Sequence, residues 1–104
     1  MHEVNLADFA AAHAEGAAVV DVREPFEYVA GHVPGARSVP LAQLPEAVGE
    51  LPRNRPVYVI CASGNRSLAA AQFLARAGID ARSVAGGTGE WLRTGRTVAT
   101  GADA

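Results

Sequence analysis

Short apolar segments of strand length alternate along this chain with segments of helical spacing, and this alternation limits the fold more than any other feature. Such an alternation predicts right-handed crossover connections and a parallel sheet with helices on both faces. The predicted strands are residues 2–4, 17–22, 36–39, 57–61 and 80–84. We therefore expect an α/β fold with a central parallel sheet of five strands.

The segments between the strands carry helix signals. Asn5 precedes apolar residues at i, i+3, i+4 and i+7, which predicts a helix that Asn5 caps and that ends near Gly16. Further helices are predicted for residues 25–30, 41–48, 67–77 and 90–93. The large aromatic residues expected in the core are Phe9, Tyr28, Phe73 and Trp91.

The length of the chain bounds its organisation. With 104 residues it is expected to be one domain, 1–104, with a core over about 4–94 and a loosely held tail over 95–104. The apolar runs are too short to span a bilayer, and the N-terminus lacks the basic and apolar regions of a signal peptide. We therefore expect a cytoplasmic protein with no membrane partner.

The charged residues and the cysteine exclude several classes of function. All nine basic residues are Arg, which excludes a Schiff-base lysine and the phosphate-binding lysine of P-loop proteins. The net charge of −2 and the scattered arginines argue against a nucleic-acid partner. The single Cys excludes an internal disulfide, and one Cys with three dispersed His residues predicts no metal site.

The segment Cys61-Ala-Ser-Gly-Asn-Arg-Ser67 carries the candidate chemistry. It places a thiol between a buried strand and a helix, where backbone N–H groups lack helical acceptors and can surround an anion. Gly64 permits the positive φ of a curled loop, and Arg66 adds a permanent charge. The candidate catalytic residue is Cys61, and the candidate substrate-binding residues are Ala62, Ser63, Gly64, Asn65, Arg66 and Ser67.

A simple estimate indicates what such a loop achieves. Lowering the pKa of the thiol from about 8.5 to about 6.5 would raise the thiolate fraction roughly twenty-fold at neutral pH. The accompanying loss of nucleophilicity is about eight-fold. Because the net gain is small, we expect the loop to act mainly by solvating the charged terminal sulfur of a persulfide.

The length of the loop separates two chemistries. Four residues lie between Cys61 and Arg66. Cysteine phosphatases use a loop one residue longer, whose wider ring accommodates a tetrahedral oxyanion, whereas the shorter ring fits a single sulfur atom. A phosphatase or arsenate reductase is therefore the remote alternative.

Four stretches of the chain, in order, resemble the rhodanese family over residues 4–91. They are Asp21-Val-Arg-Glu24, Glu27-Tyr28 with Gly31-His-Val-Pro-Gly-Ala36, Cys61-Ala-Ser-Gly-Asn-Arg-Ser67, and Gly86-Gly87 with Trp91. The resemblance implies a rhodanese-like fold and a sulfurtransferase that carries a persulfide on Cys61. It implies a donor such as thiosulfate, an acceptor such as cyanide, a thioredoxin-like protein or another thiol, and no cofactor.

Other interpretations of the same residues stay open. The domain could be a sulfur relay or partner-binding module that keeps Cys61 without turning over small donors. Arg66 could pair only with a surface carboxylate, and Ser63 and Asn65 could only shape the loop. Asp21, Arg23 and His32 are predicted to form a scaffold rather than to act on the substrate.

Overall fold

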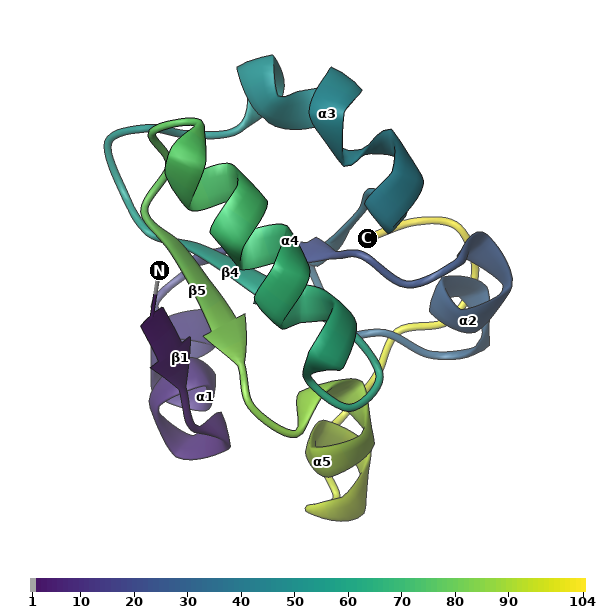
Figure 1. The fold of residues 1–104 in the computed structure, drawn as a ribbon. Coiled ribbons are helices and arrows are strands. Elements are labelled where there is room, and N and C mark those ends of the chain that lie inside the picture. Colours follow the sequence, from purple (N-terminus) through teal and green to yellow (C-terminus); the bar gives the residue numbers. More distant parts are fainter. Residues whose placement is uncertain (1) are drawn as a thin grey trace.

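The computed structural model describes residues 2–104 and has the predicted α/β architecture, shown in Figure 1. Its strands are β1 (His2–Val4), β2 (Ala18–Asp21), β3 (Arg37–Ser38), β4 (Val57–Ile60) and β5 (Ala81–Val84). They form one parallel sheet in the order β1-β5-β4-β2-β3. The central strand is therefore β4, the strand that leads to Cys61.

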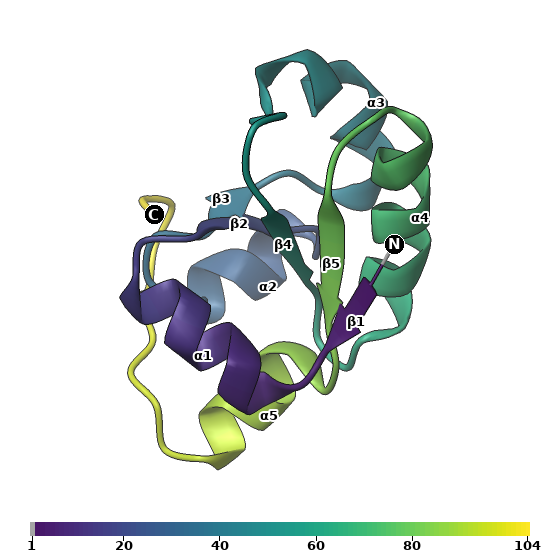
Figure 2. The same ribbon diagram turned by 90° about the vertical axis from the view of Figure 1, so that its left-hand side faces the viewer.

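The helices cover both faces of the sheet, as Figure 2 shows. They are α1 (Leu6–Ala14), α2 (Pro25–Ala30), α3 (Leu44–Ala47), α4 (Asn65–Arg76) and α5 (Gly87–Arg93). Buried side chains of α3 and α4 pack with Val57 and Val59 on one face of the sheet. Those of α1, α2 and α5 pack with Tyr58 and Ile60 on the other. Successive strand residues point to opposite faces, which is why the fully apolar β4 serves both cores.

Local signals explain where two helices begin and end. The side chain of Asn5 accepts a hydrogen bond from the backbone N–H of Asp8 at 2.8 Å, as a capping residue should. Helix α4 ends at Arg76, and Gly78 follows with φ +90°, the left-handed conformation expected of a glycine just beyond a helix.

Two predicted helices differ in the structure. Residues 41–48 form a 3-10 turn (Leu41–Gln43) followed by α3, and a second 3-10 turn covers Val48–Glu50. Pro45 has no N–H to donate back to the preceding turn, so one continuous helix cannot form there. The last helix begins at Gly87 rather than at residue 90. The sequence did not indicate this first turn, because glycine has low helix propensity.

One further expectation was wrong. Phe73 lies on the outer side of α4 and is 37% exposed, so it is not a core residue, whereas Phe9, Tyr28 and Trp91 are buried. Some residues of the segment 95–104 make backbone hydrogen bonds to the rest of the domain. Ala99 exchanges two backbone hydrogen bonds with His32, at 2.9 and 2.8 Å, and Gly101 donates to Val29. Within residues 2–104, no helix has the length and apolar character needed to cross a membrane.

Candidate active site

Cys61 lies at the carboxyl end of the central strand, where ligands of parallel α/β sheets usually sit. The chain turns away from the sheet immediately after it and enters α4 at Asn65. Gly64 makes this turn with φ +107°, a conformation that side chains other than glycine rarely adopt. Cys61 is only 1% exposed, so its sulfur lies at the bottom of the loop rather than on its surface.

The backbone of the loop points hydrogen-bond donors at the sulfur. The N–H groups of Gly64 and Ser67 lie 3.1 and 3.3 Å from Sγ of Cys61. The hydroxyl of Ser67 lies 3.5 Å from the same sulfur and 2.8 Å from the hydroxyl of Ser83 on β5. The Ser67 hydroxyl also lies 3.2 Å from the carbonyl oxygen of Gly64, so when Ser83 donates to Ser67 this carbonyl and the sulfur compete for the single Ser67 hydrogen.

These donors change the acidity of the thiol. Burial raises the pKa of Cys61 and is the largest single effect. The Ser67 hydroxyl and the backbone N–H groups of Ser67, Gly64 and Ser63 act in the opposite direction, and together they bring the pKa below its ordinary value. The loop therefore stabilises negative charge on this sulfur in spite of its burial.

Helix α5 holds the loop from its other side. The N–H of Thr88 donates to the carbonyl of Cys61 at 2.8 Å, and the N–H of Gly89 donates to the carbonyl of Ala62 at 2.9 Å. This close approach requires Gly87, because a Cβ atom there would lie 2.3 Å from the Cys61 carbonyl oxygen. The first loop carbonyls are thus directed to α5 while loop amides face the sulfur.

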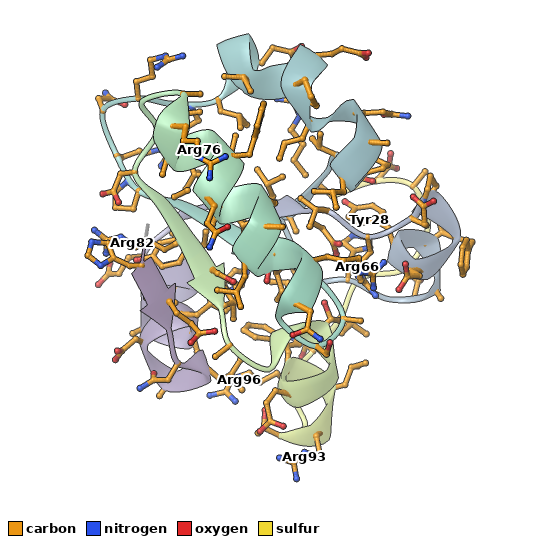
Figure 3. All side chains as sticks on the ribbon, in the orientation of Figure 1. Tyr28, Arg66, Arg76, Arg82, Arg93 and Arg96 are labelled. Atoms are coloured by element: carbon orange, nitrogen blue, oxygen red, sulfur yellow. The ribbon has the colours of Figure 1, made fainter. Side chains whose placement is uncertain are left out.

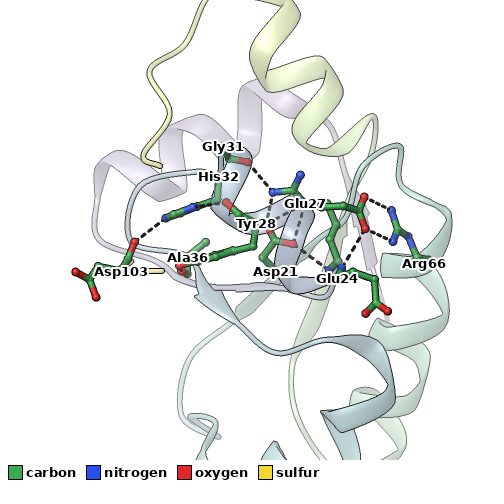
Figure 4. Close-up of polar contacts among 10 residues, drawn as sticks. Asp21, Glu24, Glu27, Tyr28, Gly31, His32, Ala36, Arg66 and Asp103 are labelled. Atoms are coloured by element: carbon green, nitrogen blue, oxygen red, sulfur yellow. Dashed lines mark hydrogen bonds and ion pairs between the residues drawn. The ribbon is translucent and has the colours of Figure 1, made fainter. Parts of the chain in front are cut away.

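Arg66 points toward α2 (Figure 3), and it pairs with Glu27, as Figure 4 shows. Its two terminal nitrogens lie 2.8 and 3.0 Å from the two carboxylate oxygens of Glu27. The hydrogen bond from Arg66 is the main cause that lowers the pKa of Glu27 from 4.5 to about 2, and the backbone N–H of Glu24 adds to it. Glu27 is therefore ionised at neutral pH, and it raises the pKa of Arg66 in return.

Asp21 and Arg23 form a buried ion pair beside this site. Arg23 is 6% exposed and donates to the fully buried Asp21 at 2.8 Å and to the carbonyl of Gly31 at 2.8 Å. Within residues 2–104, no hydrogen bond joins either side chain to the loop of residues 61–67. This geometry supports a scaffold role, which ties the end of β2 to the end of α2.

His32 extends the scaffold to the C-terminal segment. Its ring stacks on Tyr28 with 3.6 Å between centroids, and its two nitrogens lie 2.8 Å from the carbonyl of Tyr28 and 2.9 Å from that of Asp103 (Figure 4). Both nitrogens are occupied by backbone groups. His32 therefore fixes the turn, as its sequence context predicts, and is not placed to act as a base on Cys61.

The structure brings some predicted site residues together and separates others. The N–H groups of Gly64 and Ser67 point at the sulfur of Cys61. By contrast, Ser63 and Asn65 are exposed, and their side chains make no hydrogen bond within residues 2–104. The participants that sequence reasoning missed are Glu27, Ser83, Thr88 and Gly89. Glu27 is 39 residues from Arg66, so no local spacing could have indicated their contact.

A cavity of about 380 Å³ adjoins the loop through Arg66. The other residues that line it are Val22, Glu24, Leu41 and Ala42. A larger cavity of about 410 Å³ lies at the opposite end of the sheet, where Ala18 and Val57 begin their strands. No loop residue lines the larger cavity, so the smaller one is the candidate substrate cavity. Within residues 2–104, no three His, Cys, Asp or Glu side chains are grouped so that they could hold a metal ion.

Comparison with known proteins adds an independent line of evidence. The model of the rhodanese-like domain family matches residues 5–94. YqhL of Bacillus subtilis, described as uncharacterized, is 41% identical over 76 residues, which are 72% of this chain and 60% of that protein. The chain thus spans about 60% of the length of this relative.

Solved structures of related proteins have the same fold. A rhodanese-related protein from Thermoplasma volcanium has a TM-score of 0.88 and 37% identity, and the match covers 94% of this chain and 97% of that one. A rhodanese-like domain protein from Staphylococcus aureus has a TM-score of 0.82 and 30% identity, over 88% and 91% of the two chains. The fold, the matched residues 5–94 and these relatives agree, and the chain belongs to the rhodanese-like domain family.

Proposed function

We propose that this protein is a sulfurtransferase, which moves a sulfane sulfur from a donor to a thiophilic acceptor through a persulfide on Cys61. The observation that carries this proposal is the set of N–H groups from Gly64 and Ser67 around the buried sulfur of Cys61. Membership of the rhodanese-like domain family supports it. The expected donors are thiosulfate and related compounds, and the expected acceptors are cyanide and thiols, including thioredoxin-like proteins.

The chemistry requires no cofactor. The Cys61 thiolate attacks the outer sulfur of thiosulfate, the S–S bond breaks, and the electron pair leaves with sulfite. The outer sulfur is now bonded to Cys61 and carries the negative charge. Loop amides that solvate this charge stabilise the intermediate. An acceptor such as cyanide then attacks the same outer sulfur, thiocyanate leaves, and the Cys61 thiolate is restored.

The role of Cys61 is tested by intact mass. After incubation with thiosulfate, the wild-type protein is expected to gain one sulfur atom, about 32 Da, which cyanide or a reducing thiol removes. Cys61→Ser is expected to gain nothing, because the chain contains no second thiol. Uptake of sulfur by Cys61→Ser would contradict the assignment. Sulfur uptake only from a protein persulfide, and not from small donors, would favour the relay function instead.

The size of the loop is tested by inserting one glycine between Ser63 and Gly64. The insertion moves the N–H groups of Gly64 and Ser67 away from the sulfur, and each lost hydrogen bond is worth about 1 kcal/mol. Thiosulfate turnover is therefore expected to fall roughly ten- to thirty-fold. The control inserts glycine between Arg53 and Asn54, in an exposed loop. Equal turnover in both variants would show that ring size does not select sulfur, provided that melting curves show both are folded.

A further inference from the structure

The charge of Arg66 is already compensated, and this bears on which donor the site accepts. Glu27 faces Arg66 with both carboxylate oxygens, at 2.8 and 3.0 Å, so the pair is bidentate. The carboxylate of Glu27 stays ionised at neutral pH because its pKa is lowered to about 2. A dianionic donor that approaches the loop therefore meets an ion pair with no net charge rather than a free guanidinium cation.

The cavity beside the loop adds a further negative charge and an apolar wall. Of the five residues that line it, Glu24 and Arg66 are charged and Val22, Leu41 and Ala42 are apolar. With Glu27 included, the formal charge around the cavity is −1, from two carboxylates and one guanidinium. Leu41 is 36% exposed, so part of its apolar surface meets water unless a ligand covers it.

From these observations we propose that the site selects an organic sulfane-sulfur donor, with an apolar group beside the sulfur and at most one negative charge, over the inorganic dianion thiosulfate. The apolar group would lie against Val22, Leu41 and Ala42. The inference rests on the proposed sulfurtransferase function and narrows its donor. Organic thiosulfonates and alkyl persulfides belong to this class.

The chemical step balances for such a donor. With a thiosulfonate R–SO₂–S⁻, the Cys61 thiolate attacks the terminal sulfur and a new S–S bond forms. The bond between the sulfonyl sulfur and the terminal sulfur breaks, and its electron pair leaves with the sulfinate R–SO₂⁻. Cys61 is left as a persulfide anion, and no oxidant or reductant is needed.

Benzenethiosulfonate and thiosulfate are suitable probes, because a phenyl group replaces one charged oxygen while the reacting sulfur is the same. Glu27→Gln removes the negative charge beside Arg66 and keeps an oxygen that can accept from Glu24. For a dianion roughly 6 Å from the lost charge in a water-like dielectric, kcat/KM for thiosulfate is expected to rise about tenfold. For the monoanion benzenethiosulfonate the expected rise is only about threefold. Intrinsic reactivities cancel when variants are compared.

The apolar wall is tested separately. Leu41→Ser is expected to lower the ratio of kcat/KM for benzenethiosulfonate to kcat/KM for thiosulfate at least fivefold, because thiosulfate has no apolar group to lose contact. The matched control is Leu92→Ser, since Leu92 is 50% exposed on α5 and does not line the cavity. Leu92→Ser should change kcat/KM for neither donor.

One measurement needs no substitution. Because like charges repel less in salt, kcat/KM of the wild type for thiosulfate should rise between roughly 10 mM and 150 mM ionic strength. A fall would mean that the dianion is attracted and would overturn the inference. If the ratio of kcat/KM for benzenethiosulfonate to kcat/KM for thiosulfate is unchanged in both Glu27→Gln and Leu41→Ser, the inference is also overturned, while the proposed sulfurtransferase function stands. Absence of sulfur uptake by the wild type from either donor would overturn the proposed function itself.

Discussion

Replacing Gly87 with alanine is expected to lower the free energy of unfolding by about 2–5 kcal/mol, because overpacking costs about 1–3 kcal/mol and the left-handed backbone conformation costs about another 1–2 kcal/mol. The new Cβ atom would lie 2.3 Å from the carbonyl oxygen of Cys61 and 2.8 Å from that of Ala62. Gly87 also has φ +55°. Both effects fall on the contact between α5 and the loop, so the sulfur environment should be lost along with stability.

Thermal or denaturant unfolding measures this loss, and two other glycines separate its causes. The expected fall in melting temperature for Gly87→Ala is roughly 8–25 °C. Gly35 has φ +85° but no atom within 4 Å of its Cβ position, so Gly35→Ala isolates the backbone strain. Gly49 has neither feature, and Gly49→Ala should be close to neutral. Equal melting temperatures for Gly87→Ala and Gly35→Ala would show that α5 moves away from the loop without cost.

Removing the carboxylate of Asp21 is the second change with a large expected effect. Asp21→Ala leaves the buried side chain of Arg23 with a single hydrogen-bond partner, the backbone carbonyl of Gly31. An uncompensated buried charge typically destabilises a protein by about 3–5 kcal/mol, so the melting temperature should again fall by roughly 12 °C or more. The backbone N–H of Arg23 also loses its acceptor, Oδ1 of Asp21.

The chain contains its own control for this prediction. Asp80 and Arg82 have the same spacing and pair at 3.1 Å, but their side chains are 45% and 31% exposed. Asp80→Ala should therefore cost about 1 kcal/mol or less. If Asp21→Ala and Asp80→Ala destabilise the protein equally, burial does not determine the strength of the first pair and the scaffold assignment loses its basis.

The sheet could be predicted from the sequence because each strand carries its own local signal. Residues 57–61 are apolar or β-branched throughout, which indicates a strand buried on both faces, and the central place of β4 agrees with this. The core position predicted for Phe73 was wrong because it depends on what α4 packs against, and periodicity alone carries no information about that. The continuous helix predicted over residues 41–48 was wrong for a local reason, because Pro45 interrupts the backbone hydrogen bonds there.

Only part of the candidate site could likewise be predicted from the sequence. A donor-lined loop around Cys61 follows from a strand end, a helix start and Gly64, which are neighbours in sequence. The alternative in which Arg66 pairs with a carboxylate could be stated in advance, but its partner Glu27 could not be identified. That contact joins α2 to α4 across the fold and exists only once the sheet has brought them together.

The hydrogen bonds from Thr88 and Gly89 to the loop carbonyls have a consequence for rates. In the proposed cycle, negative charge moves outward by one S–S bond each time sulfur is gained and returns when it is lost. Water around an exposed thiolate would have to rotate at every such step. Here α5 fixes the first two peptide groups of the loop, and the second of these carries the N–H of Ser63, so part of the donor set is held in place and the reorganisation energy is lowered. Sulfur transfer should then depend only weakly on solvent viscosity.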